Sequence, residues 1–269
     1  MDSSRGDAPG LTPVLRLTPT RRYPPISFLI YLISMSVAEA VTTYADPRIG
    51  LGLHALILLS LLVHGSIARH VQSRRFLVLL ALAPLLRIMS LAVPRGNNPL
   101  IRWYLIVGVL LALATFLAAR VTGMSGGRIG LSFRSWPAQI LVGLTGPCLG
   151  LIEFYILKPG PAVGELSWRS IWLPALIFLA FTGFLEEIVF RGLIQQAALE
   201  RMGKIGLLYV PALFAVMHLG YRSAMDIVFV FIVGLAFGLI AFRMRSLLGV
   251  SLAHGLTNVT LYLIYPFFL

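Results

Sequence analysis

The residues best suited to chemistry in this sequence are polar side chains inside long apolar stretches. They fall into three short patterns, and their members are Glu186, Glu187, Arg191, His218, His254 and Asn258. A charged side chain at bilayer depth is costly unless it is paired or faces water, so each of these residues is a functional candidate. Together they supply carboxylates, imidazoles, an amide and a guanidinium, which are the groups that hydrolysis at a carbonyl requires.

The first pattern, FTGFLEEIVFRG at 181–192, contains two adjacent carboxylates and one arginine. Glu187 and Arg191 are four residues apart, with the acid on the N-terminal side, which is the favourable order for an ion pair on one helical face. Glu186 points about 100° away and can face another helix. A snorkelling cluster at a helix end is the structural alternative, but it leaves the second acid without a role.

The second pattern, VPALFAVMHLG at 210–220, places His218 four residues after Phe214 on the same helical face. The Phe214 ring is expected to exclude water from the space beside the imidazole and to contact substrate. The polar turn at 200–204 predicts an antiparallel hairpin, in which Glu186 and His218 are equally far from Met202 and reach a similar depth. Alone, a buried histidine is more often a core residue than a base, and this shared depth favours the functional interpretation.

The third pattern, GVSLAHGLTNVTLYL at 249–263, carries His254 and Asn258 four residues apart on one face. Both side chains can donate a hydrogen bond to one substrate atom. The structural alternative is a hydrogen bond between membrane helices, which histidine and asparagine often make.

Two hydrolytic mechanisms are compatible with these residues. In the first, Glu186 and His218 activate a water molecule, while His254 and Asn258 stabilise the oxyanion. In the second, Glu186, His218 and His254 bind zinc, and Glu187 acts as the base. The sequence does not decide between them, so no cofactor is assigned and zinc is the alternative.

The elements that position these residues are membrane helices. Of the 269 residues, 58% are hydrophobic and 12% are charged, which excludes a soluble domain of ordinary composition. At roughly 20 residues per span, the apolar stretches predict an all-α polytopic transmembrane helix bundle with about 8–9 spans. These stretches are 26–44, 49–68, 76–93, 100–119, 137–157, 171–199, 205–219, 225–242 and 247–268.

The net charge of +12 comes from short basic clusters between apolar stretches. Clusters in such positions indicate the orientation of membrane helices. The charge therefore predicts contact with membrane lipid and no nucleic-acid partner. Alternate connections are the basic ones, which predicts a cytoplasmic N-terminus and a C-terminus on the outside. Arg95 and Arg102 are the exceptions. The single cysteine, Cys148, excludes a disulfide framework and a multi-cysteine metal site.

Three regions are expected along the chain. Residues 1–25 are polar and rich in Pro, Ser and Arg, as in a disordered cytoplasmic tail. Residues 26–125 form the N-terminal transmembrane helices, and residues 126–269 form the core with the polar patterns. The segment from Gly126 to Trp136 is too short to span and is expected to lie along the inner interface.

The remaining polar residues inside apolar stretches are expected to be structural. Glu39, Arg87 and Glu153 have no partner four residues away, although Glu39 can pair with Arg87 across helices. The histidines without a nearby acid are His54, His64 and His70.

The three patterns resemble a known family. EEIVFR, FAVMH and HGLTN resemble the EExxxR, FxxxH and HxxxN motifs of the CAAX protease and bacteriocin-processing (CPBP) family, which includes type II CAAX prenyl endopeptidases. The resemblance covers roughly Pro137 to Tyr265. It implies an all-α intramembrane bundle with a conical cavity open to the cytoplasm and lipid.

The resemblance also implies roles for the six polar residues. Glu186 and His218 would hold the catalytic water, and Glu187 and Arg191 would support the site. An oxyanion pocket would be formed by His254 and Asn258.

The expected function is therefore that of an intramembrane endopeptidase acting on a membrane-associated or prenylated, CAAX-type peptide. The expected location is the plasma membrane of a prokaryote. The alternative is a non-enzymatic membrane protein, such as a transporter, an immunity factor or a scaffold factor, that uses the same polar cluster for binding or stability.

Overall fold

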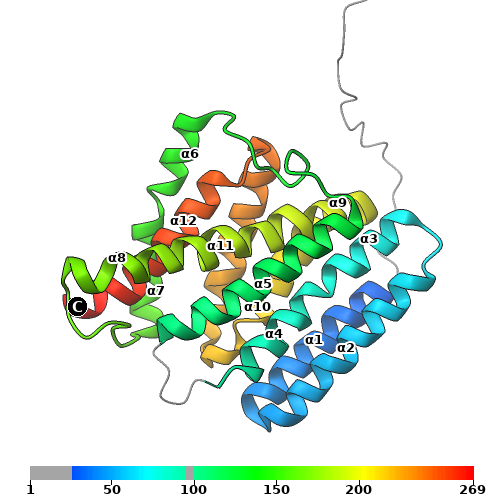
Figure 1. The fold of residues 1–269 in the computed structure, drawn as a ribbon, viewed down its shortest axis with the longest axis horizontal. Coiled ribbons are helices and arrows are strands. Elements are labelled where there is room, and N and C mark those ends of the chain that lie inside the picture. The colour runs from blue at the N-terminus through cyan, green and yellow to red at the C-terminus, as the bar shows by residue number, and fades with distance from the viewer. Residues whose placement is uncertain (1–25, 95–99) are drawn as a thin grey trace, which may run out of the picture.

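The computed structural model describes residues 26–94 and 100–269, which form an all-helical bundle with no strand in these ranges (Figure 1). The predicted tail at 1–25 lies outside the described residues. The α-helices are α1 (Ile26–Tyr44), α2 (Pro47–Ile67), α3 (Val71–Leu80), α4 (Leu82–Ala92), α5 (Leu100–Thr122), α6 (Trp136–Gly143), α7 (Gly146–Leu157), α8 (Trp168–Ile177), α9 (Gln195–Met202), α10 (Gly206–Val216), α11 (Ala224–Met244) and α12 (Leu248–Val259). Wider π-helical stretches are η1 (Phe178–Leu185), η2 (Ile188–Ile194) and η5 (Thr260–Ile264), and short 3-10 turns are η3 (Gly203–Ile205), η4 (Leu219–Tyr221) and η6 (Tyr265–Phe267).

Local sequence signals account for several helix boundaries. The Asp46 side chain accepts a hydrogen bond of 2.7 Å from the Arg48 backbone N–H, and Pro47 follows at the first helical position of α2. Ser223 caps α11 in the same way through the N–H of Asp226. Gly203 ends α9 with a φ of 61°, a conformation that glycine adopts readily, and the chain reverses there into α10.

Seven stretches of the described residues are long and apolar enough to cross a membrane, compared with the expected 8–9 spans. One of them, Trp168–Tyr221, has 54 residues and contains the predicted hairpin, in which α10 packs against α9. The last helical stretch, Leu248–Phe267, is not among the seven, because its polar side chains lower its hydropathy. The predicted polytopic bundle is confirmed, and the hairpin and this last stretch account for the difference in number.

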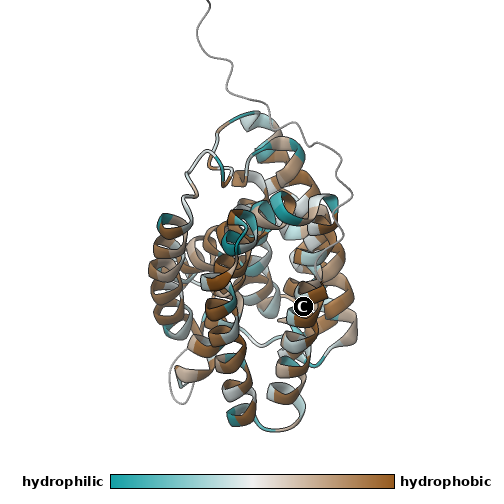
Figure 2. Ribbon diagram, turned by 90° about the vertical axis from the view of Figure 1, so that its right-hand side faces the viewer, coloured by the Kyte–Doolittle hydropathy of each residue, from teal (hydrophilic) through white to brown (hydrophobic). Residues whose placement is uncertain are grey.

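The outer surface of the bundle is apolar. Figure 2 shows hydrophobic residues along the lengths of the helices and hydrophilic residues mainly at their ends. Large exposed side chains include Leu59, Phe116 and Ile232. Such a surface is typical of helices that face lipid, since all their backbone polar groups are paired within the helix.

The N-terminal helices contain a buried ionic cluster. Arg87 Nη2 lies 2.6 Å from Glu39 Oε2, which confirms the predicted pairing of these two residues. His54 Nε2 lies 3.4 Å from the other oxygen of the same carboxylate. Glu39 has no exposed surface, so its charge depends on these two partners.

The hydrophobic core is continuous across the expected boundary near Gly126. A single cluster of buried residues includes Leu61 and Phe76 from the N-terminal helices together with Val189 and Val210 from the later ones. The connection after α5 is also anchored to the later helices, because the Leu247 N–H donates a 2.9 Å hydrogen bond to the Gly130 carbonyl.

Candidate active site

Three helical segments carry the six candidate residues. Glu186 and Glu187 lie between η1 and η2, His218 follows the end of α10, and α12 carries His254 and Asn258. The segments η1 and α12 pack more extensively than any other pair of elements. The tertiary fold therefore gathers patterns that are separated in the sequence.

Two facing glycines set the separation of η1 and α12. A Cβ atom placed on Gly183 would lie 2.7 Å from the Cα of Gly255 and 2.7 Å from the carbonyl oxygen of Ser251. No real side chain tolerates such contacts with backbone atoms, so the close approach requires glycine at position 183. It brings the Glu186–Glu187 segment close to His254.

The two adjacent glutamates join two π-helical stretches. A π-helical turn widens the helix and changes the direction in which its side chains point. Such turns occur frequently at functional sites. The sequence was interpreted with a regular α-helical period, so this widening was not predicted.

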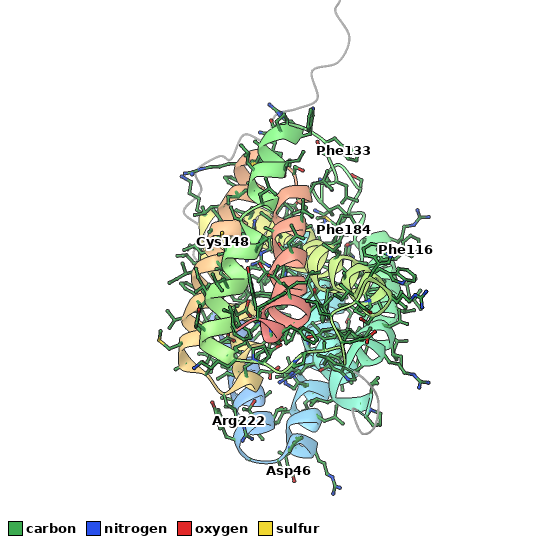
Figure 3. All side chains as sticks on the ribbon, turned by 90° about the vertical axis from the view of Figure 1, so that its left-hand side faces the viewer. Asp46, Phe116, Phe133, Cys148, Phe184 and Arg222 are labelled. Atoms are coloured by element: carbon green, nitrogen blue, oxygen red, sulfur yellow. The ribbon has the colours of Figure 1, made fainter. Side chains whose placement is uncertain are left out.

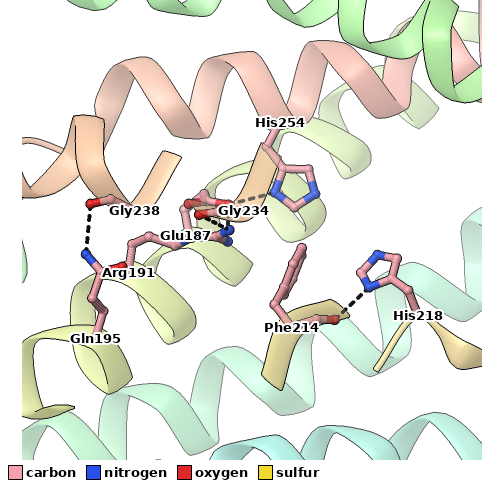
Figure 4. Close-up of polar contacts among 8 residues, drawn as sticks. All are labelled: Glu187, Arg191, Gln195, Phe214, His218, Gly234, Gly238 and His254. Carbon is pink, nitrogen blue, oxygen red and sulfur yellow. Dashed lines mark hydrogen bonds and ion pairs between the residues drawn. The ribbon is translucent and has the colours of Figure 1, made fainter. Parts of the chain in front are cut away.

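Glu187 and Arg191 form the predicted ion pair and are closed to solvent. Arg191 Nη1 donates to Glu187 Oε1 at 2.8 Å (Figure 4). The exposed fraction is 1% for the Arg191 side chain and 0% for the Glu187 side chain. Arg191 Nη2 also donates to the carbonyl oxygen of Gly234 at 3.3 Å. The guanidinium carbon lies 4.6 Å from the centre of the Phe214 ring, an additional favourable contact for a desolvated cation.

His254 contacts Glu187, which the sequence did not predict. His254 Nδ1 lies 2.9 Å from Glu187 Oε1, the oxygen that also accepts from Arg191. An ionised carboxylate can only accept hydrogen bonds, so Nδ1 carries the hydrogen. The other ring nitrogen, Nε2, is then the one left for a ligand.

His218 is oriented by the backbone. Its Nδ1 lies 2.9 Å from the carbonyl oxygen of Phe214, and a carbonyl can only accept, so this nitrogen is the donor. In the neutral ring, Nε2 then has a free lone pair. The Phe214 ring lies 4.8 Å from the His218 ring and 5.9 Å from the His254 ring, between the two imidazoles (Figure 4).

A cavity of about 70 Å³ lies at the centre of these residues. This volume can hold more than one water molecule. Its walls include all the residues singled out from the sequence: Glu186, Glu187, Arg191, Phe214, His218, His254 and Asn258. Glu186, His218, His254 and Asn258 are partly exposed, whereas Glu187 and Arg191 are fully buried. Glu187 and Arg191 can therefore act on a ligand only through their neighbours.

Several wall residues were not selected from the sequence. Glu153 of α7 lines the cavity, although its isolated position within an apolar stretch led to a structural interpretation. Tyr104 and Tyr221 also line it, without a sequence signal that distinguishes them from other aromatic residues. Gln195 is not a wall residue but could have been noticed, since it lies four residues after Arg191; it is fully buried and donates to the Gly238 carbonyl at 3.0 Å.

The zinc alternative needs a preformed group of ligands. Across residues 26–94 and 100–269, no group of three or more His, Cys, Asp or Glu side chains is arranged to hold a metal ion. The proposed ligands Glu186, His218 and His254 line one cavity without forming such a group. No step is therefore derived through a metal.

Part of the chain is similar to a known protein family. Residues 167–260 match the family model described as type II CAAX prenyl endopeptidase Rce1-like. No curated protein and no solved structure gives a significant match to the chain. The matched region runs from the cap of α8 to the beginning of η5 and contains all six polar residues of the three patterns.

Proposed function

Because residues 167–260 match the family model of Rce1-like type II CAAX prenyl endopeptidases, we propose that this chain is an intramembrane endopeptidase that uses an activated water molecule. The observation that carries the proposal is the arrangement around the small cavity. Two proton acceptors, the Glu186 carboxylate and the lone pair on His218 Nε2, line the same water-sized space as two candidate donors, His254 and Asn258.

Water activation is the first step. A water molecule in the cavity donates one hydrogen to Glu186 and the other to His218 Nε2, which leaves an oxygen lone pair free to attack. Glu186 takes the proton as the oxygen bonds to the carbonyl carbon of the scissile peptide. The product is a tetrahedral intermediate with its negative charge on the former carbonyl oxygen.

His254 and Asn258 stabilise that oxyanion. Asn258 donates through its amide. Since the hydrogen on His254 Nδ1 is donated to Glu187, Nε2 donates to the oxyanion only when the ring is an imidazolium. Glu187, held by Arg191, stabilises this state as a positioning residue and does not touch the substrate.

The last step expels the amine. Glu186 returns its proton to the leaving nitrogen as the carbon–nitrogen bond breaks, giving a carboxylic acid and an amine. The new carboxylic acid then loses its proton to water. The Phe214 ring fills the space between the imidazoles and, in this proposal, contacts the substrate beside the scissile bond. The substrate is a membrane-associated peptide, and the experiment below determines whether that peptide must be prenylated.

The test uses purified protein in lipid nanodiscs with internally quenched peptides, with and without a prenyl group. Glu186→Gln and His218→Ala are each expected to lower kcat by about 100-fold or more, as is typical of a lost general base. The matched control is Glu165→Gln, an exposed acid between α7 and α8, which should retain wild-type turnover. Turnover unchanged by Glu186→Gln would contradict the assignment.

Metal dependence is tested on the same preparation. A metal-free mechanism predicts substoichiometric zinc by elemental analysis and full activity after incubation with a chelator. One zinc ion per chain, together with loss of activity on chelation, would replace the proposed mechanism by the zinc alternative.

A further inference from the structure

A second, larger cavity adjoins the candidate site. Its volume is about 520 Å³, which lies in the range of ligand-binding pockets. The two cavities share five wall residues, namely Tyr104, Glu186, Phe214, His218 and Tyr221. The larger cavity therefore reaches the two residues that hold the water in the proposed mechanism.

Many of the remaining walls of this cavity come from one end of the bundle. They include Thr43 at the end of α1, Pro47 at the start of α2, Ser90 and Pro94 at the end of α4, and Arg222 after η4. Asp46 and Arg222 lie at this end in Figure 3, and we call it the Asp46 end. Phe133 lies at the opposite end, here called the Phe133 end.

The exposed part of the cavity wall also lies at the Asp46 end. Its wall residues Pro47, Pro94, Gly220, Tyr221 and Arg222 are exposed and lie at or beside connections between helices. The rim is held together across the bundle, since the Arg222 guanidinium donates to the carbonyl oxygen of Thr43. A peptide that enters by this route approaches from the Asp46 end.

Among the described residues, the Phe133 end carries more basic residues than the Asp46 end. Its connections are joined by contacts between Arg75 and Glu200, between Arg201 and Ser73, and between Ser246 and Ser132. The basic residues at this end are Arg69, Arg74, Arg75, Arg120, Arg128, Arg134, Arg201, Lys204, Arg243 and Arg245.

The Asp46 end is much less basic. Among the described residues it carries Arg48, Arg102, Lys158, Arg169 and Arg222, along with the acids Asp46, Glu165 and Asp226. Loops rich in Lys and Arg remain in the cytoplasm during membrane insertion, so the Phe133 end is the cytoplasmic one.

We propose that the larger cavity is the substrate entrance and opens on the non-cytoplasmic face of the membrane. The enzyme then cleaves peptide segments presented outside the cytoplasm, such as membrane-tethered parts of exported polypeptides. This inference rests on the proposed endopeptidase function. It departs from the cytoplasmic opening that the family resemblance implies, because the charge of the loops and the position of the rim place the entrance at the opposite end.

Cysteine labelling tests the orientation of the cavity independently of proteolysis. Cys148 is the single cysteine of the chain, so Cys148→Ser provides a background for new cysteines. Ser90→Cys places a thiol in the wall of the larger cavity, and Ser125→Cys places a matched control on the exposed connection after α5 at the Phe133 end. Right-side-out and inverted membrane vesicles are treated with a membrane-impermeant maleimide.

The Ser90→Cys thiol is expected to react in right-side-out vesicles and the Ser125→Cys thiol only in inverted ones. Reaction of Ser90→Cys only in inverted vesicles, or in neither preparation, would overturn the proposal. Labelling requires no turnover, so this result stands apart from any failure of the proposed function. In oriented vesicles of active protein, a quenched peptide added on the non-cytoplasmic side should be cleaved.

Discussion

Glu187 is the residue at which the individual interactions of the site converge. One of its oxygens accepts from both Arg191 and His254, and no part of its side chain is exposed. It therefore links a buried ion pair to an imidazole that reaches the cavity. A carboxylate in this position fixes the tautomer and the orientation of the imidazole.

Shortening this side chain tests its positioning role. Glu187→Asp retains a charge for Arg191 but withdraws the oxygen from His254 Nδ1, so kcat should fall by roughly 100-fold, as for a lost oxyanion donor, with little change in KM. Peptide-cleavage kinetics measure both parameters, and Asn258→Ala, which removes the other donor, should have a similar effect. An unchanged kcat, or an effect confined to KM, would argue against this role.

Arg191 is expected to matter chiefly for stability. Arg191→Met leaves the Glu187 carboxylate buried with only a histidine partner, which should cost about 3–5 kcal/mol. The thermal midpoint of the purified protein should then fall by roughly 10 °C. The double variant Glu187→Gln with Arg191→Met should lose less than the sum of the single losses, because no charge is left unpaired. Strictly additive losses would show that the pair is not coupled.

At the scale of elements, the site depends on how closely η1 approaches α12. Gly183 faces Gly255 and the Ser251 carbonyl across this contact, and η1 continues directly into the Glu186–Glu187 segment. The spacing between Glu186 and the pair His254 and Asn258 is thus set by backbone contact between two helices. Small residues at helix interfaces allow such close approach in membranes.

A methyl group at this contact should separate the two elements. Gly183→Ala is expected to lower kcat by at least tenfold and to lower the thermal midpoint, because a 1 Å displacement is enough to disrupt catalysis. The matched control is Gly52→Ala in α2, where no atom lies within 4 Å of the new methyl group. Equal activity of the two variants would contradict the importance of the contact.

At the scale of the whole molecule, the N-terminal helices are part of the structure that supports the site. The main hydrophobic cluster joins them to η2, α9 and α10, and α4 and α5 supply walls of the larger cavity. Without the N-terminal helices, residues 126–269 would lose their partners in this cluster and the cavity walls that α4 and α5 supply. The structural unit around the site therefore includes more than the region that matches the family model.

Splitting the chain tests this dependence. Residues 126–269 expressed alone should be inactive and poorly folded, because apolar core surface would lose its partners. Co-expression with residues 1–125 should restore peptide cleavage. Measurements on membranes that contain one fragment or both would decide the point, and activity of residues 126–269 alone would refute it.

Much of the molecule could be predicted from local sequence. The apolar stretches predicted the helical membrane bundle, because only helices satisfy the backbone of such segments in lipid. The spacing of Glu187 and Arg191 predicted their ion pair, since residues four apart share a helical face. The sequence allowed a pairing of Glu39 with Arg87 across helices, and the structure contains it.

Only the tertiary structure decided how the patterns meet. The contact of His254 with Glu187, the place of Phe214 between two imidazoles and the two adjoining cavities all depend on how helices distant in sequence pack. Helical periodicity determines which side chains share a face, but backbone contacts such as that between Gly183 and Gly255 determine which faces meet. The sequence by itself therefore determined the helical membrane fold and the side chains that are candidates for chemistry, and packing between helices decided which of them line one cavity.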